Sequence, residues 1–126
     1  MHYALLIYGA LDARRARAEA DTADDGVIDS WLGYTRALRE AGVLAGAEQL
    51  HEAETATSVR VRTGERLLTD GPFMETKEHL LGFFEIDVPD LDTALDWAAK
   101  MPVMRYGTVE VRPVKEGQAW RAGLKK

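Results

Sequence analysis

A chain of 126 residues, 46% of them hydrophobic and 29% charged, is long enough for one globular domain with its own hydrophobic core. Its formal net charge of −5 argues against a general binder of nucleic-acid backbones, which would need a basic face. The absence of cysteine excludes disulfides, thiolate catalysis and metal sites built on cysteine.

The sequence carries no recognisable signal for secretion or for a membrane. It does not start with a basic segment and a long apolar stretch, and no apolar run approaches the roughly 20 residues of a membrane span. We therefore predict a cytoplasmic protein without a membrane or nucleic-acid partner. Residues 1–126 are expected to form a single domain, with 115–126 as a polar C-terminal tail.

The first predicted strand covers residues 3–8, and it is largely apolar on both faces, so both faces are expected to be covered. After an exposed connection over residues 10–24, a helix is predicted that is capped by Asp24 or Asp25 and ends at Gly42. Helical spacing predicts that its buried stripe consists of Ile28, Trp31, Leu32, Thr35 and Leu38.

A short second strand is predicted over residues 43–47, and a hairpin follows it. Residues 56–62 and 65–69 flank Thr63-Gly64, and their alternation of Val with Arg indicates two strands with one solvent-exposed face. We interpret this hairpin as an insertion between two strands of the main sheet.

The apolar run over residues 80–88 predicts the next long strand, and Asp90 is the expected N-cap of a second helix. The buried stripe of that helix is expected to be Leu91, Ala94, Leu95 and Ala98. Residues 106–112 are the last predicted core strand. The order strand, helix, strand, hairpin, strand, helix, strand predicts an α+β fold of the split βαβ type with an inserted hairpin.

Strong turn chemistry and a cluster of charges follow the hairpin, in the segment Thr69 to Glu78. In Asp70-Gly71-Pro72 the Asp can bond nearby backbone, the Gly accepts a positive φ and the Pro fixes its own φ. The turn is expected to present Asp70, Glu75, Lys77 and Glu78 around one point.

With this motif, the sequence resembles the YCII-related family, in particular its branch with an Asp-Gly-Pro-Phe (DGPF) motif. The resemblance also rests on Tyr3–Tyr8, Ala41–Gly46, Thr55–Arg60, Asp90–Ala94 and Val109–Pro113. It implies a small ferredoxin-like α+β domain that dimerises through its sheet as a dimeric α/β barrel. It implies little about the reaction.

The apolar pattern leads to a homodimer by a separate argument. Two helices can cover one face of the four main strands, and Leu81 and Phe83 are expected on the other face, opposite Phe84, Ile86 and Val88. A monomer would expose a larger apolar patch than soluble proteins usually show, so a second copy placed face to face is the economical solution.

The same helix-free face is where we expect a small-molecule site. Several polar side chains are predicted to converge there beside the apolar Leu81 and Phe83: Tyr8, Glu48, Asp70, Thr108, Glu110 and Arg112. An apolar pocket with a few fixed polar groups is the usual form of such a site. Glu110 and Arg112 share a face and can pair, either in the site or as a structural ion pair at the dimer interface.

Asp70 is the candidate general base, provided that a pocket shields it and a second acid such as Glu48 or Glu75 lies near. The alternative is an inert Asp that bonds the amides of its own turn. Phe73 is either a lid over a ligand or a plug that anchors the loop, and we favour the plug.

His79, at the start of a strand, is the best proton-transfer candidate of the three histidines, and its alternative is a half-exposed strand-end residue. His51 precedes Glu52 and Glu54 but lacks the ligand spacing of a zinc motif, so no metal is predicted. Some members of the wider family carry a helical histidine in a proposed acid/base dyad. Here that region reads Asp29-Ser30-Trp31-Leu32, so the dyad cannot be transferred.

Two functions remain open. The first is a cofactor-independent acid/base enzyme for a small organic molecule, with Asp70 as base, Arg112 holding an anionic group and Tyr8 or Glu110 orienting the substrate. Glu75 and Phe73 are further candidate substrate contacts. The second is a non-catalytic module that binds a small molecule or a partner protein and has a regulatory role.

Overall fold

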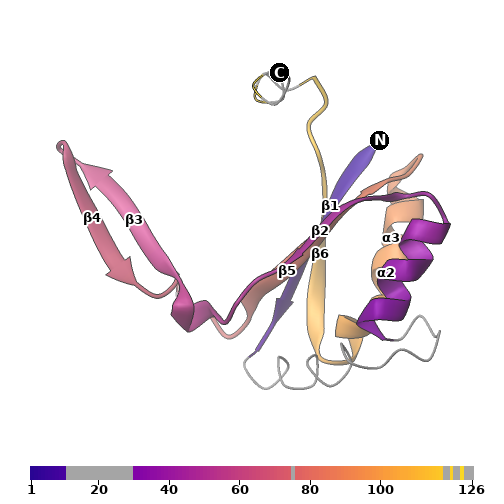
Figure 1. Cartoon of the computed structure of the whole chain (residues 1–126), viewed down its shortest axis with the longest axis horizontal. Helices are drawn as coiled ribbons and strands as arrows, with labels where there is room; N and C mark the ends of the chain where they lie inside the picture. Colours follow the sequence, from indigo (N-terminus) through magenta and orange to yellow (C-terminus); the bar gives the residue numbers. More distant parts are fainter. Residues whose placement is uncertain (11–29, 75, 118–119, 121–122, 124–126) are drawn as a thin grey trace.

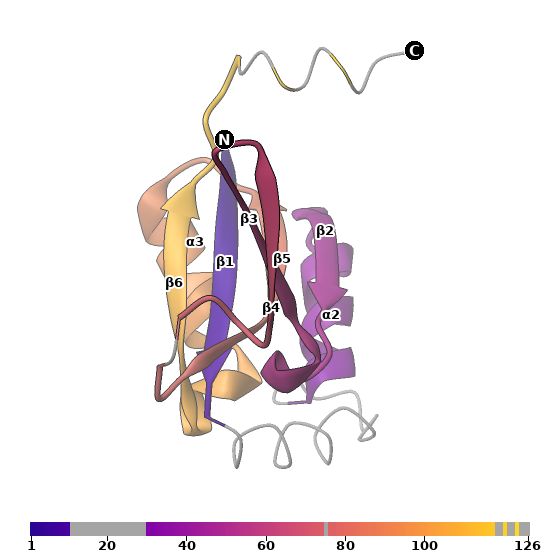
Figure 2. The ribbon, with the colours of Figure 1, turned by 90° about the vertical axis from the view of Figure 1, so that its left-hand side faces the viewer.

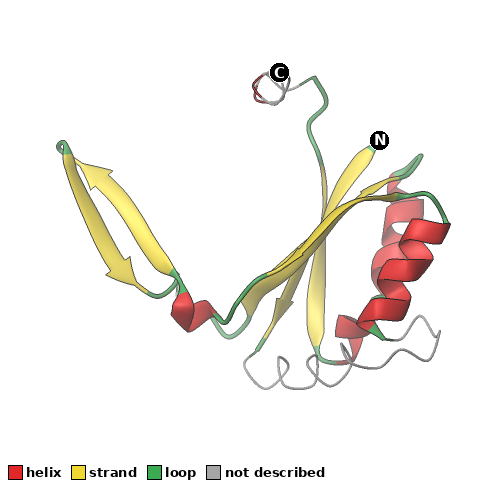
Figure 3. Ribbon diagram, in the orientation of Figure 1, coloured by secondary structure: helices red, strands yellow, loops and turns green. Residues whose placement is uncertain are grey.

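The structure is a computed structural model, which describes residues 1–10, 30–74, 76–117, 120 and 123. It confirms the α+β class: an antiparallel sheet carries two helices on one face, and a separate hairpin projects away from it (Figures 1 and 3). Within these ranges, no helix has the length and apolar character needed to cross a membrane.

The element order agrees with the predicted one. The elements are β1 (His2–Gly9), α2 (Trp31–Glu40), β2 (Leu44–Gln49), β3 (Thr57–Arg62), β4 (Glu65–Asp70), β5 (His79–Asp87), α3 (Leu91–Ala99) and β6 (Gly107–Pro113), with short 3-10 turns at η1 (Ala53–Thr55) and η2 (Pro102–Arg105). The main sheet has the order β2-β5-β1-β6, and all its pairs are antiparallel. The central strands β1 and β5 are therefore each paired on both sides.

Helix α2 begins later than predicted, because Ser30 caps it by accepting a 3.0 Å hydrogen bond from the Gly33 amide. The predicted caps Asp24 and Asp25, like Ile28 and most of the predicted connection, lie outside the described residues. Leu32 was wrongly assigned to the buried stripe: its side chain is 42% exposed. Tyr34 takes its place, since it lies nearly one turn from Trp31 on the face toward the sheet.

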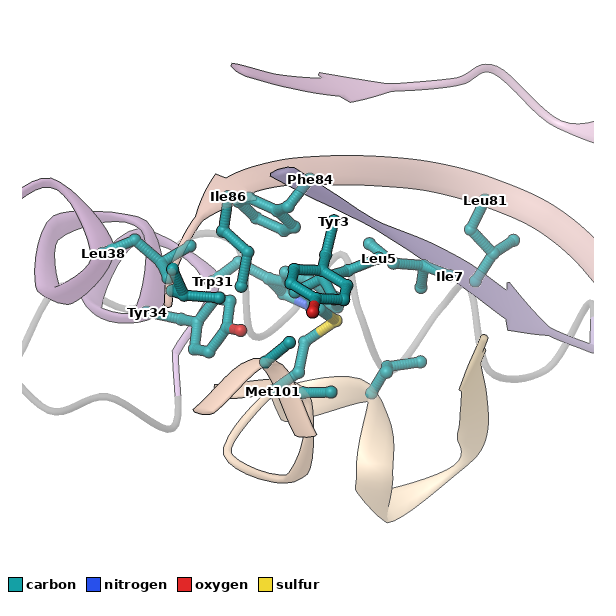
Figure 4. Close-up of a cluster of buried hydrophobic side chains, with 14 residues drawn as sticks. Tyr3, Leu5, Ile7, Trp31, Tyr34, Leu38, Leu81, Phe84, Ile86 and Met101 are labelled. Carbon is teal, nitrogen blue, oxygen red and sulfur yellow. The ribbon is translucent and has the colours of Figure 1, made fainter. Parts of the chain in front are cut away.

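The core lies between the sheet and the helices, and aromatic rings stack at its centre (Figure 4). The ring of Phe84 on β5 lies parallel to that of Trp31, with centroids 6.2 Å apart, and meets the edge of Tyr34 at 5.4 Å. The buried Tyr34 hydroxyl donates a 2.7 Å hydrogen bond to the Trp97 carbonyl, and burial raises the pKa of this phenol. These contacts fix α2 against β5 and the end of α3.

A β-bulge changes the predicted alternation of β5. Ile7 pairs with Gly82 but Tyr8 pairs with Leu80, so Leu81 has no partner on β1. Its side chain is 3% exposed and belongs to the core, so its predicted place on the helix-free face was wrong. Phe83, half-buried on β5, lies opposite Leu6 on that face as predicted.

Helix α3 has the predicted N-cap, because the Asp90 carboxylate accepts hydrogen bonds from the Thr93 amide at 2.8 Å and hydroxyl at 2.7 Å. Its buried stripe is narrower than predicted. Ala94 and Ala98 are buried, but Leu91 and Leu95 are 47% and 45% exposed. The two small alanines allow α3 to approach the sheet closely. The larger Leu91 and Leu95 lie at the sides of the helix, where they stay exposed.

The hairpin has the predicted strands and turn, with φ of 50° at Thr63 and 78° at Gly64. At its base, the Gly71 amide donates a 2.6 Å hydrogen bond to the Ala56 carbonyl, and Gly71 itself has a φ of 92°. The prediction of one covered face was wrong. All residues of β3 and β4 are exposed except the half-buried Ser58, because the hairpin forms a sheet of its own.

We expect Gly82→Ala to destabilise the domain by roughly 1–3 kcal/mol, since a Cβ there would lie 2.5 Å from the Glu48 carbonyl oxygen. Gly46→Ala on β2 is the matched control, because nothing lies within 4 Å of its added Cβ. Urea unfolding of both variants measures the difference, and equal losses would contradict steric crowding as the cause.

Asp90→Ala should lower the melting temperature by a few degrees, because the helix loses its cap. Asp90→Asn should retain most of the stability that the cap provides, because Asn also caps helices. Hydrogen bonds from the hydroxyl and amide of Thr93 hold the pKa of the Asp90 carboxyl below its usual range. A lowered pKa stabilises the fold above the unfolded-state value of about 3.9. The difference in unfolding free energy between the native chain and Asp90→Asn should therefore shrink as the pH falls through the folded-state pKa of Asp90. A difference that stays constant from pH 7 to 2 would contradict this origin.

Candidate functional site

The largest of three cavities within the described ranges of the chain, of about 670 Å³, lies where the hairpin joins the sheet. This volume is within the range of pockets that hold small organic ligands. The cavity is lined by Tyr8, Leu50, His51, Glu52, Ala53, Thr55, Ala56, Pro72, Phe73, Met74, Thr76, Glu78, His79 and Leu80. Its walls therefore come from three segments: the end of β1 and the two connections that lead into and out of the hairpin.

The hairpin itself brings these connections together. Thr57 pairs with Asp70 at its base, so residues 50–56 and 72–80 must lie side by side although more than 15 positions separate them. The Ser58 hydroxyl adds a 2.8 Å hydrogen bond to the Gly71 carbonyl. The contribution of residues 50–56 was missed in the sequence, where His51 was considered only as a metal ligand. The pairing register of the two hairpin strands is the sequence signal from which the contribution of residues 50–56 could have been predicted.

Apolar side chains make up most of the lining, with Phe73 and Met74 on the loop after the motif turn. Phe73 is 69% exposed and Met74 54% exposed, so Phe73 is not buried as a plug would be. The Thr76 hydroxyl hydrogen-bonds to the Glu78 carbonyl, which orders the loop just before β5. These two exposed apolar side chains border the cavity.

Ionisable side chains also line this cavity. His79 is half-buried at the start of β5 and lines both this cavity and a neighbouring one of about 90 Å³. His51 and Glu78 line the large cavity as exposed residues. A ligand here would thus meet an apolar surface with two imidazoles and two carboxylates, those of Glu52 and Glu78.

The structure brings together three predicted site residues, Tyr8, Phe73 and His79. Asp70 is exposed at the end of β4 and lines none of the three cavities described for this chain. Among the described residues, its carboxylate accepts no hydrogen bond from an amide of its own turn, and Glu48 lines a different cavity. Glu75 lies outside the described residues.

Glu48 and Phe83 line a different cavity, of about 200 Å³, between β2, β5 and the start of α2. Trp31 and Phe84 form part of its wall, and Gly82 lies at its floor, where β2 approaches closely. The predicted convergence of Glu48 with Tyr8 in one cleft is therefore not present within a single chain.

Glu110 and Arg112 form an ion pair on β6. The Arg112 guanidinium donates to one Glu110 carboxylate oxygen, through Nη2 at 2.5 Å and Nε at 3.1 Å. Glu110 raises the pKa of Arg112, and Tyr8 adds a smaller effect in the same direction. Both side chains are largely exposed, at 41% and 66%, so Arg112 is oriented toward a surface and not into the large cavity.

The part of the chain that the structure describes contains no group of three or more His, Asp or Glu side chains arranged to hold a metal ion.

Sequence comparison matches nearly the whole chain to known proteins. The family described as "YCII-related domain" matches residues 1–118. A protein of Rhizobium meliloti (strain 1021), itself described as uncharacterised, is 38% identical over 116 residues, which cover 90% of this chain and 92% of that protein.

Proposed function

Because the chain belongs to the YCII-related family, we propose that it is a homodimeric protein that binds a small, largely apolar organic molecule in the cavity of about 670 Å³. The observation that carries the proposal is this cavity, whose volume and mainly apolar lining with a few ionisable groups match small-molecule sites. The relative from Rhizobium meliloti is uncharacterised, so the ligand class is argued from the side chains alone.

The proposal also includes the topology of the fold and the way in which two chains form a dimer. The strand order β2-β5-β1-β6, with α3 linking β5 to β6 across β1, supports a ferredoxin-like topology. The half-buried Leu6, Tyr8 and Phe83 on the helix-free face support a dimeric barrel in which a second copy covers that face. The Asp70 to Phe73 motif supports the DGPF branch of the family.

The ligand would be held between the loop of Phe73 and Met74 and the wall formed by Leu50 and Leu80. Burying the exposed Phe73 and Met74 side chains against an apolar ligand gives a favourable free energy of roughly 25 cal/mol per Å². His51 and His79 lie where a polar or anionic substituent of the ligand would find a hydrogen-bond donor.

Acid/base catalysis is the second candidate, and the position of His79 favours it. This side chain is half-buried, at the junction of two cavities, and belongs to a rigid strand. The proposal assigns the proton transfer to His79 in preference to Asp70, which lines none of the described cavities. The proposed acid/base reaction uses no cofactor.

Binding is tested with 8-anilinonaphthalene-1-sulfonate, an aromatic anion, followed by amide chemical shifts in ¹H–¹⁵N spectra. Saturable shifts should concentrate at residues 50–56 and 72–80. Leu80→Ala should weaken binding about tenfold through lost apolar contact, while Leu95→Ala, an exposed leucine on α3, should not. Shifts scattered over the surface, or equal losses in both variants, would count against the cavity.

Catalysis is tested with a panel of small esters, hydroxy acids and unsaturated acids. For any substrate that the chain turns over, His79→Gln should reduce kcat by at least about a hundredfold, the usual contribution of a general acid or base. His2→Gln is the control, because His2 is on β1 and hydrogen-bonds to Glu85 outside the cavity. Undiminished turnover by His79→Gln would rule out this role.

A further inference from the structure

The hairpin β3–β4 is the part of the molecule with the least cover. It projects to one side of the main sheet, and its tip lies far from the body of the domain (Figures 1 and 2). All residues of its two strands are exposed except the half-buried Ser58. Two-stranded hairpins without a packed face are at best marginally stable in water. A contact with another molecule would supply the packed face that the domain itself does not provide.

The two faces of the hairpin differ in character. The pairing register places Val59 directly opposite Leu68, and Val61 lies on the same face two residues further along β3. The side chains of Val59, Leu68 and Val61 are 58%, 60% and 59% exposed, and together they form an apolar stripe. The opposite face carries two arginines and a glutamate beside Leu67, so it is mainly polar.

Two opposite charges flank the apolar stripe on its own face. On β4, Arg66 lies two residues before Leu68 and Asp70 lies two residues after it, so about 7 Å of strand separates each from the centre of the stripe. Within the described part of the chain, neither the Arg66 guanidinium nor the Asp70 carboxylate forms an ion pair or a side-chain hydrogen bond. Both charges are therefore available to a partner molecule.

We propose that this face of the hairpin packs against the same face of the hairpin in another copy of the chain. The inference rests on the homodimer of the proposed function. In that homodimer the two sheets face each other, and the hairpins would then join two such dimers into a tetramer. The helix-free face of the sheet is left entirely to the barrel contact.

The flanking charges favour a second copy in one orientation. When a two-fold axis crosses the strands at Leu68, the two hairpins run in opposite directions and Arg66 of each copy lies over the partner's Asp70. The apolar stripes then meet at the centre, and an ion pair closes the contact at each end. Such a surface is complementary to itself, which is the property that a two-fold contact between identical chains requires.

The barrel dimer also answers the question of strength. Strands of six residues are about 20 Å long, and a face of two strands offers much less than a standard interface, which buries about 800 Å² per partner. A single hairpin contact would therefore be weak. A barrel dimer carries two hairpins, and if the two-fold axes of both contacts meet, the second hairpin contact forms within the same pair of dimers. The resulting high effective concentration strengthens the tetramer without any new surface.

Light scattering of the full chain over a range of concentrations gives the first test, with a tetramer as the expected state. Leu68→Lys should raise the dissociation constant of tetramers into dimers at least about a hundredfold, because it places a charge at the centre of the contact. Leu67→Lys, on the opposite face, is the matched control and should change this constant by less than about threefold. A tetramer that survives Leu68→Lys, or equal losses in the two variants, would overturn the proposal.

Charge reversal tests the orientation of the two hairpins. In a contact between identical copies, Arg66→Asp and Asp70→Arg each place like charges over one another, so each variant alone should lose tetramer affinity at least about tenfold. An equimolar mixture of the two variants should form tetramers again, because every reversed charge then faces an opposite one. Native mass spectrometry should find two chains of each variant in these tetramers. No recovery on mixing would contradict the proposed pairing.

The homodimer and the hairpin contact fail separately. A native chain that stays dimeric at all concentrations and is unaffected by Leu68→Lys would retain the homodimer and overturn the hairpin contact. A native dimer that Leu68→Lys converts into monomers would retain the hairpin contact and overturn the barrel dimer. A monomer at all concentrations would overturn both, while binding of the sulfonate probe would still report on the cavity.

Discussion

The antiparallel pairing of β1 with β5 is the contact on which the other parts of the fold depend. It brings Leu5 beside Phe84 under the two helices, and it brings Tyr8 beside Leu80 at the wall of the large cavity. The bulge at Leu81 lies between these two regions and turns an additional leucine into the core. One strand pair thus supplies the centre of the core at one end and a wall of the candidate site at the other.

The hairpin has two separate consequences for the candidate site. Its closed base, where the Gly71 amide bonds the Ala56 carbonyl, makes neighbours of the two segments that line the cavity. Its strands also carry apolar side chains that the rest of the domain does not cover. A local insertion of 14 residues, Thr57 to Asp70, therefore shapes the candidate ligand site and adds exposed apolar surface to the molecule.

Local signals in the sequence were sufficient for the element order, the hairpin strands and the Asp90 cap, since each depends on residues a few positions apart. Predictions that required tertiary geometry were less successful. Simple alternation cannot reveal the bulge that buries Leu81, and the approach of α3 to the sheet, set by Ala94 and Ala98, decides that Leu95 stays exposed. Of the residues proposed from the sequence, Tyr8, Phe73 and His79 line the cavity, whereas Asp70, at the base of the hairpin, does not, and the strand pattern alone cannot tell these cases apart.

The placement of β1 has a consequence for the way the chain reaches its fold. This strand pairs with β5 and β6, so that His2 lies opposite Asp87 and Tyr3 opposite Pro113. Contacts between such distant segments make folding slow compared with that of domains built on local contacts. On the ribosome, β1 has no partner strand until β5 has emerged and is paired on both sides only after β6, so both of its apolar faces stay open to other chains in the meantime. The hairpin, whose two strands are adjacent in the sequence, can close long before that, so the base that lines the candidate cavity can form while the main sheet is still unfinished.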